Sequence, residues 1–270
     1  TGPANAPDHR IKWTSSNKTA ATVDENGTVT ALRPIETVTI TAVYKTNPAL
    51  TCSWNLKITR TKGYITKQML DNLDLTAIKK VMITAHPDDE TLWGGGHLIE
   101  GEYLVVCMTH GWNPKRRTAF EQTMRTTNDK YLILDYPDVR KTFSNGKYET
   151  DMLSTCKNAM QEDINLILSY KKWDLIATHN PFGEYGKFLH KTISQMVTQC
   201  YNKMTNKSAT LYYFGRYYNS SNKIPGEQIA PELLAIKNSM VDRYYPTAKG
   251  AIVAFGHMIP YENWLLPSEW

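Results

Sequence analysis

Short apolar segments alternate with longer amphipathic ones from about residue 76 to residue 200. The segments 80–85, 103–108 and 173–178 are typical of buried strands, because each is a short, nearly continuous apolar run. Between the last two, residues 118–130 and 149–170 have helical spacing. Strands that alternate with helices predict an α/β fold, in which a mostly parallel sheet carries helices on both faces.

The sequence before residue 60 has a different character. Thr and Val alternate in short runs at 21–23 and 28–31, and the Asn26-Gly27 pair between them is typical of a tight hairpin. Further alternating runs at 38–43 and 54–58 predict a small all-β sandwich. We therefore expect a β module over residues 1–60, a linker over 61–75 and an α/β domain over 76–270.

Composition excludes several classes of protein. The 270 residues carry 31 Lys and Arg against 26 Asp and Glu, and this net charge of +5 is not gathered into a basic run, so we expect no nucleic-acid partner. No apolar run approaches the roughly 18 residues of a transmembrane helix. Four cysteines without a C-x-x-C pair indicate neither a disulfide framework nor a structural zinc site.

A cluster of metal-binding residue types follows the first strand of the predicted α/β domain, in His86-Pro87-Asp88-Asp89-Glu90. Strand ends are where α/β sheets hold their sites. His86 and Asp89 are three residues apart and can bind one zinc ion, which leaves Asp88 as a free carboxylate to deprotonate a water molecule. The alternative is a helix N-terminus, with Asp88 or Asp89 as the capping residue.

A second polar loop follows the strand at 173–178 and runs through Tyr185 and Lys187 to His190. Because this loop also lies at the carboxyl end of a strand, it can bring His190 opposite the first cluster. Three protein ligands that leave one position open are typical of a catalytic zinc site.

The β module resembles the bacterial Ig-like (group 2) domains, in Trp13-Thr14-Ser15-Ser16-Asn17 and in the run from Ala21 to Ala31. This resemblance implies a secreted or bacterial cell-surface protein. It also implies a spacer or adhesive role, with contact to a cell surface or a glycan.

The two polar loops together resemble the PIG-L/LmbE-like family of zinc-dependent N-acetylglucosamine deacetylases. The first family motif, (A)HPDDE, is intact from Ala85 to Glu90, and the second, GxYGHxxH, is partly present from Gly183 to His190. The resemblance covers residues 76–270 and implies a Rossmann-like α/β domain. It also implies Zn²⁺, or another divalent transition metal, as the cofactor.

Site residues follow from this resemblance position by position. His86, Asp89 and His190 are implied as zinc ligands, and Asp88 as the general base. Tyr185 is implied to hold or polarise the acyl oxygen. Lys187 replaces the family's first histidine in the second motif. Its ammonium group can stabilise negative charge, although it can equally be a solvent-facing loop lysine.

Three further residues are candidates for substrate contact. His110 ends the second strand of the predicted α/β domain, Arg117 opens the helix that follows, and His257 lies near the C-terminus. An equal alternative for Arg117 is a surface pair with Glu121, four residues later.

The sequence therefore predicts a hydrolase that removes the N-acetyl group from an amino sugar or glycoconjugate. Two alternatives stay open. One is a hydrolase of another amide or ester at the same site, and the other is a carbohydrate-binding or adhesive surface protein with a degenerate catalytic domain.

Overall fold

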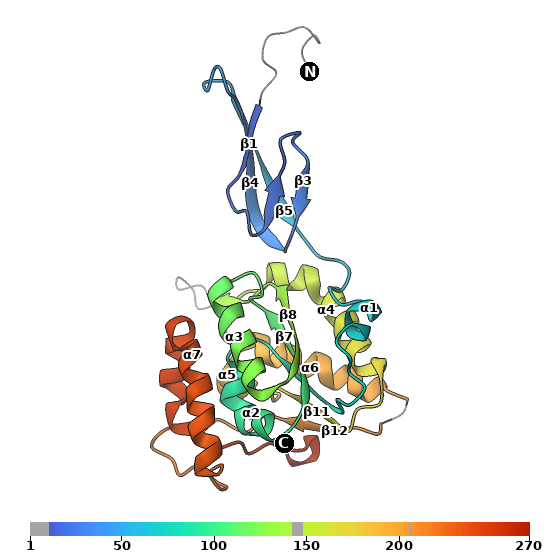
Figure 1. Cartoon of the computed structure of the whole chain (residues 1–270), viewed down its shortest axis with the longest axis vertical. Helices are drawn as coiled ribbons and strands as arrows, with labels where there is room; N and C mark the ends of the chain where they lie inside the picture. Colours follow the sequence, from blue (N-terminus) through green and yellow to red (C-terminus); the bar gives the residue numbers. More distant parts are fainter. Residues whose placement is uncertain (1–10, 142–147, 206) are drawn as a thin grey trace.

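The computed structural model describes residues 11–141, 148–205 and 207–270. The first ten residues of the predicted β module lie outside this range. The N-terminal part is a small antiparallel β region that stands at one end of the α/β domain (Figure 1). Its two sheets have the order β1-β4-β5 and β2-β3. The strands are β1 (Ile11–Ser15), β2 (Ala21–Val23), β3 (Val29–Ala31), β4 (Ile35–Tyr44) and β5 (Thr51–Ile58).

The predicted hairpin joins β2 to β3. Gly27 has a φ of 83°, which favours glycine, and the Asp24 carboxylate accepts hydrogen bonds from the backbone N–H groups of Asn26 and Thr28. The strands pair antiparallel with Val23 opposite Val29. The hairpin prediction is therefore confirmed.

The segment predicted as a linker packs onto the α/β domain. It contains helix α1 (Lys67–Asp71), and Ile65, Leu70 and Leu75 are buried in the core. The Asp163 carboxylate accepts the backbone N–H groups of Tyr64 and Ile65. Packing of the α/β domain therefore begins near residue 63, before the first strand of its sheet.

The sheet of the α/β domain has five parallel strands in the order β12-β11-β6-β7-β8. The expected parallel sheet is thus confirmed. Its strands are β6 (Lys80–Thr84), β7 (Tyr103–Thr109), β8 (Lys130–Tyr136), β11 (Leu175–Thr178) and β12 (Thr210–Tyr213). Two short strands outside this sheet pair with each other, β9 (Arg140–Lys141) and β10 (Tyr148–Glu149).

Helices flank both faces of this sheet (Figure 1). Neighbouring residues of β6 point in opposite directions, so Val81 and Ile83 enter one apolar core and Met82 enters the other. The first core includes residues of α4 (Asp151–Tyr170) and α6 (Phe188–Lys203). The second includes residues of α2 (Asp89–Glu100), α3 (Pro114–Thr127) and α7 (Pro231–Phe255). The remaining helical turns are α5 (Gly183–Gly186), η1 (Gly256–Met258) and η2 (Pro267–Glu269).

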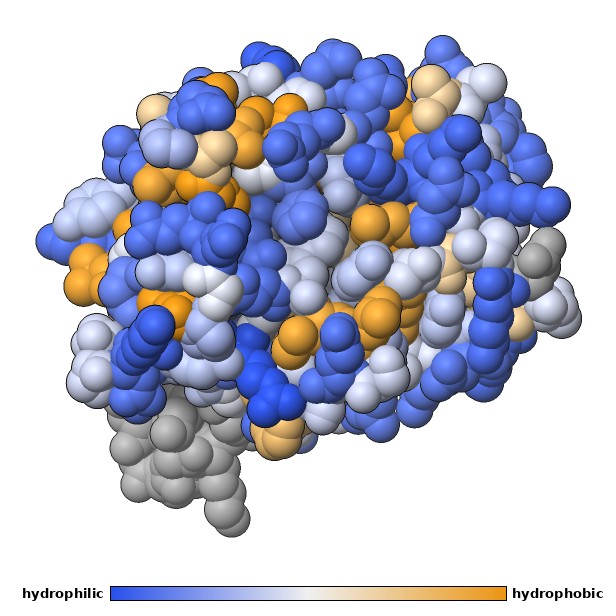
Figure 2. All heavy atoms as spheres, turned by 90° about the horizontal axis from the view of Figure 1, so that it is seen from below, coloured by the Kyte–Doolittle hydropathy of each residue, from blue (hydrophilic) through white to orange (hydrophobic). Residues whose placement is uncertain are grey.

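The surface opposite the N-terminal strands is largely hydrophilic, with apolar residues in separate spots (Figure 2). Within the described ranges, no helix is long and apolar enough to cross a membrane. Cys156 and Cys200 are buried free thiols, and Cys107 is also buried and free.

Candidate metal centre

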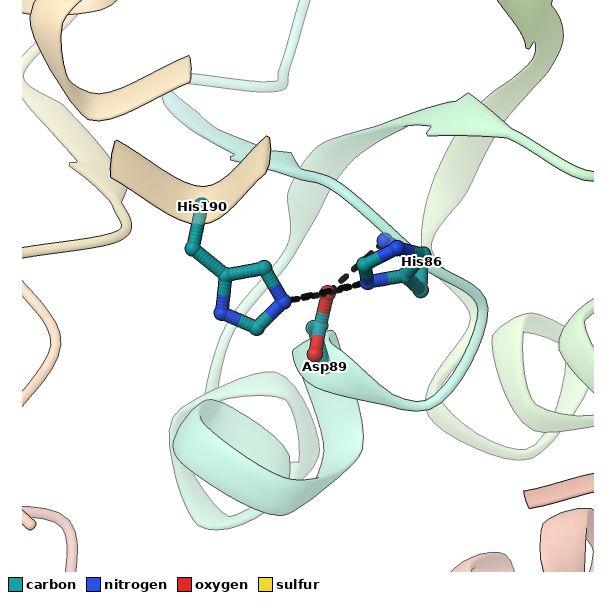
Figure 3. A group of neighbouring side chains, drawn as sticks. All are labelled: His86, Asp89 and His190. Atoms are coloured by element: carbon teal, nitrogen blue, oxygen red, sulfur yellow. Dashed lines mark hydrogen bonds and ion pairs between the residues drawn. The ribbon is translucent and has the colours of Figure 1, made fainter. Parts of the chain in front are cut away.

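Three side chains with metal-binding donor atoms converge beyond the carboxyl end of β6. His86 lies in the turn after this strand, Asp89 begins α2, and His190 lies in the first turn of α6. All three are buried, and they point toward one another (Figure 3). The structure thus brings together the three residues that the sequence predicts as metal ligands.

The spacing of the donor atoms fits one tetrahedral ion. His86 Nδ1 lies 3.2 Å from Asp89 Oδ2 and 3.0 Å from His190 Nε2, and the last two atoms are 3.4 Å apart. Metal–ligand bonds of about 2.0–2.2 Å place tetrahedral ligands about 3.3–3.6 Å from each other. A zinc ion therefore requires only a small adjustment of these side chains.

The outer nitrogens of both imidazoles are engaged with carboxylates. His86 Nε2 lies 3.0 Å from Asp138 Oδ1, and His190 Nδ1 donates to Glu184. In neutral rings this leaves the lone pairs of His86 Nδ1 and His190 Nε2 directed at the Asp89 carboxylate. Three electron-rich atoms meet there, and a cation, either a metal ion or a proton, must hold them together.

The negative charge around His86 favours the protonated form of its imidazole ring. Burial lowers the pKa of His86, but the carboxylates of Asp138 and Asp89 outweigh burial and raise it to about 10. Burial lowers the pKa of His190. A metal ion at this position would therefore compete with a proton on His86.

The Asp88 carboxyl group faces the same pocket but does not join the three donors. Burial raises its pKa to about 7, and the Arg116 guanidinium, 3.2 Å away, opposes this rise. Asp88 occupies the N-cap position of α2, yet its side chain makes no capping hydrogen bond. The structure therefore does not support the alternative that Asp88 serves as a helix cap.

The backbone at Asp88 is held in an unusual conformation. Its φ is 148°, where residues other than glycine are rarely found. The buried Glu90 carboxylate accepts the Asp88 N–H at 3.1 Å and also the Tyr244 hydroxyl at 2.6 Å. These bonds tie the turn to α7 and direct the Asp88 carboxyl group into the pocket.

The pocket lined by His86, Asp88 and Asp89 has a volume of about 250 Å³. Tyr185 and Lys187 both line it, and the Lys187 ammonium group lies 5.9 Å from the centre of the Tyr185 ring. Lys187 is exposed to solvent and also lines the pocket, so the expectation of a solvent-facing lysine and that of a residue near the site both hold. Burial raises the pKa of the Tyr185 hydroxyl, which keeps its proton for donation to an oxyanion.

Arg116, rather than Arg117, lines this pocket. Arg116 donates to the carbonyl of Pro87 at 2.9 Å and pairs with Asp88. Arg117 instead donates to the Gly111 carbonyl and lies 3.6 Å from Glu121, which matches the alternative of a surface pair. The structure thus places Arg117 outside the pocket lining.

The two histidines predicted as substrate contacts lie in different places. His110 Nε2 lies 3.3 Å from Asp138 Oδ2, and its ring centre is 5.7 Å from that of His86. His257 Nε2 donates to the Tyr218 carbonyl at 2.8 Å, and His257 does not line the pocket. His110 is thus adjacent to the candidate metal ligand His86, and His257 lies outside the pocket.

Sequence reasoning missed both carboxylates that orient the ligands. Asp138 follows β8 and reaches His86, and the pKa of its carboxyl group is held well below its usual range, because His86 and His110 outweigh the effect of burial. Glu184 lies between His190 and His179, with His179 Nδ1 at 3.1 Å. The available sequence signal for Glu184 was its position five residues after His179, which directly follows a strand.

Comparison with known proteins identifies relatives of both parts of the chain. Residues 1–53 match the family model "Bacterial Ig-like domain (group 2)". The uncharacterized protein L374 of Acanthamoeba polyphaga mimivirus is 31% identical over 175 residues, which are 58% of this chain and 67% of that protein. The uncharacterized protein CA_P0160 of Clostridium acetobutylicum is 33% identical over 91 residues, which are 33% of this chain but 9% of that protein. The chain therefore belongs to the same protein family as L374 of mimivirus.

Proposed function

We propose that the protein is a metal-dependent hydrolase that removes the acetyl group from an N-acetylated amino sugar or glycoconjugate. The observation that carries this proposal is the convergence of His86, Asp89 and His190, with the separate buried carboxyl group of Asp88 beside them. Metal ligands and a neighbouring general base are the groups that metal-assisted hydrolysis of an amide uses.

His86, Asp89 and His190 would hold the ion, and Zn²⁺ suits two imidazoles and one carboxylate. When bound, such an ion supplies a Lewis acid that polarises the amide carbonyl and makes water more acidic. Asp138 and Glu184 keep the two imidazoles turned toward the ion through their outer nitrogens.

Asp88 is the proposed proton carrier. As a carboxylate, it accepts a proton from the water molecule that adds to the carbonyl carbon. The C–N bond then breaks, and Asp88 delivers this proton to the departing nitrogen, so the products are acetate and a free amine. A carboxyl group whose pKa is raised to about 7 suits both steps near neutral pH.

Tyr185 and Lys187 are the proposed donors to the oxyanion. Both line the pocket beside Asp88 and carry a proton that can approach the developing charge. The match to bacterial Ig-like domains supports a place of action at the cell surface or outside the cell, where N-acetylated glycans are exposed.

The direct test is acetate release by the full chain, loaded with Zn²⁺ or treated with a chelator. N-acetylglucosamine, its glycosides and acyl amides that lack a sugar serve as substrates. Asp88→Asn should lower kcat by about 10²–10⁴ while zinc binding is retained. Asp242→Asn, on the exposed side of α7, is the matched control and should keep full activity.

Three outcomes would count against the proposal. A metal-loaded protein that releases no acetate from any amino sugar would favour a degenerate domain that only binds glycans. Release only from amides without a sugar would change the substrate class. Full activity of Asp88→Asn would remove Asp88 from the mechanism.

A further inference from the structure

A second hollow, of about 710 Å³, lies between the N-terminal β region and the α/β domain. We call it the interdomain groove. Arg33 and Glu36 line it from the β region, and Trp112 and Asp151 line it from the α/β domain. Both parts of the chain are therefore needed to form it.

The interdomain groove lies next to the pocket of the candidate metal centre. Asp138 lines both hollows. The rings of His86, His110 and Trp112 follow one another at centre-to-centre distances of 5.7 and 6.3 Å. The Arg33 guanidinium lies 4.3 Å from the Trp112 ring centre. This row of rings leads from a metal ligand to the β region.

The sizes of the two hollows indicate different occupants. A pocket of about 250 Å³ is slightly smaller than the 300–1,000 Å³ or so of typical small-ligand sites, so it suits one sugar ring. The groove is larger and adjoins the pocket at Asp138, a placement that suits a ligand occupying both.

The chemistry of the groove favours a neutral ligand rich in hydroxyl groups. Its described lining contains the acidic residues Glu36, Asp138 and Asp151 and a single guanidinium, from Arg33, and Glu36 is paired with Lys57 at 2.9 Å, so the groove has no cluster of cations to bind a polyanion. Trp112 offers an aromatic surface beside these polar groups, a combination that suits the apolar faces and hydroxyl groups of sugar rings.

We propose that the interdomain groove binds the neighbouring sugars of a neutral oligosaccharide whose N-acetylated unit lies in the metal pocket. The assignment rests on the proposed function for the identity of that unit. It makes the β region part of the substrate-binding surface, with Trp112 as the main contact and Arg33 as the residue that orients the indole ring.

Binding to the metal-free full chain tests this assignment without turnover. Isothermal titration calorimetry compares N-acetylglucosamine with its β-1,4-linked tetramer. We expect the tetramer to bind at least about tenfold more tightly, and Trp112→Ala to remove most of this difference while affinity for the monosaccharide stays unchanged. Trp54→Ala, an exposed tryptophan on β5 outside the groove, is the matched control and should change neither affinity.

Two further variants keep the test decisive if Trp112→Ala does not fold. Trp112→Phe should keep part of the preference for the tetramer, because it retains a ring. Arg33→Ala should weaken tetramer binding alone, since Arg33 lies in the β region and away from the metal centre.

Equal affinities for the two sugars, equal weakening of both by Trp112→Ala, or tighter binding of an anionic oligosaccharide would each overturn the assignment. Acetate release without any effect of chain length would refute the groove and leave the proposed hydrolase standing. Tetramer binding that depends on Trp112, without acetate release, would support the groove and refute the hydrolase.

Discussion

The two parts of the molecule each contain a lysine–glutamate ion pair, in opposite surroundings. Lys237 and Glu262 meet at 2.6 Å in the α/β domain, where their side chains are 0% and 2% exposed. Lys57 and Glu36 meet at 2.9 Å in the β region, where their side chains are 43% and 61% exposed. Breaking the buried pair should therefore cost more stability than breaking the exposed one, because water can replace a lost partner only at the surface.

The buried pair also connects to the candidate site. Lys237 donates to the Leu92 carbonyl, and Glu262 accepts the backbone N–H groups of Gly96 and His97. These bonds fix α2, the helix that begins with the candidate ligand Asp89. The α/β domain thus uses a buried ion pair to hold its candidate site, whereas the Lys57–Glu36 pair of the β region lies at the surface.

The largest effect should come from breaking the buried pair. Lys237→Met leaves the Glu262 carboxylate buried without its cation, and we expect a loss of about 3 kcal/mol in the free energy of unfolding. Lys57→Met should cost less than about 1 kcal/mol. Urea unfolding followed by helical circular dichroism measures the first, and hydrogen exchange of the β4 and β5 amides in urea measures the second. Similar losses in both variants would contradict the comparison.

Metal affinity should depend steeply on pH, because the metal displaces the proton of His86. The pKa of His86 is raised to about 10, so the ring is protonated at neutral pH without metal, and acid favours this metal-free form. Affinity for Zn²⁺ should fall about tenfold for each unit of decreasing pH between 8 and 6. Competition with a chelator at several pH values measures the slope. A flat profile would show that no proton is released.

Glu184→Gln should weaken Zn²⁺ binding by about 10–100-fold, since the charged partner of the His190 ring is lost. Glu227→Gln, an exposed residue outside the site, is the matched control. Titration with Zn²⁺ at constant pH measures both variants. If the two bound the metal equally well, orientation of His190 by Glu184 would not matter.

The smallest of these effects concerns the acidic limb of the pH–activity profile, where activity rises with increasing pH. Asp88 must be ionised to accept a proton, so activity should rise with pH through the pKa of Asp88. Arg116 lowers this pKa, and Arg116→Met should therefore move the limb upward by roughly one pH unit. Arg117→Met, whose guanidinium lies outside the pocket, should leave the limb in place, as kcat/KM against pH will show.

Local patterns were sufficient to predict much of this fold. The Asn26-Gly27 hairpin depends on backbone conformations within a few residues, and β6, β7 and β11 depend on short apolar runs. His86, Asp88 and Asp89, from the first candidate metal-binding cluster, lie within four consecutive residues. Each of these features is encoded by neighbouring residues, so single-sequence reasoning finds it.

Features that depend on distant contacts were not predictable in this way. Asp138 reaches His86 only because β8 joins the sheet beside β7. The choice between Arg116 and Arg117 depends on helix phase, since one residue turns a side chain by about 100°. Gly95 allows close approach of Lys237, whose Cγ would lie 2.9 Å from an added Cβ atom. Each answer depends on a partner far away in the sequence.

The most direct test of the central claim is the metal content of the full chain after purification and exposure to Zn²⁺. We predict about one zinc ion per chain, with loss of the ion in His190→Ala and retention in His257→Ala. A chain that retains no metal after gel filtration, or one that binds it equally well without His190, would contradict the assignment of these three residues as a metal centre.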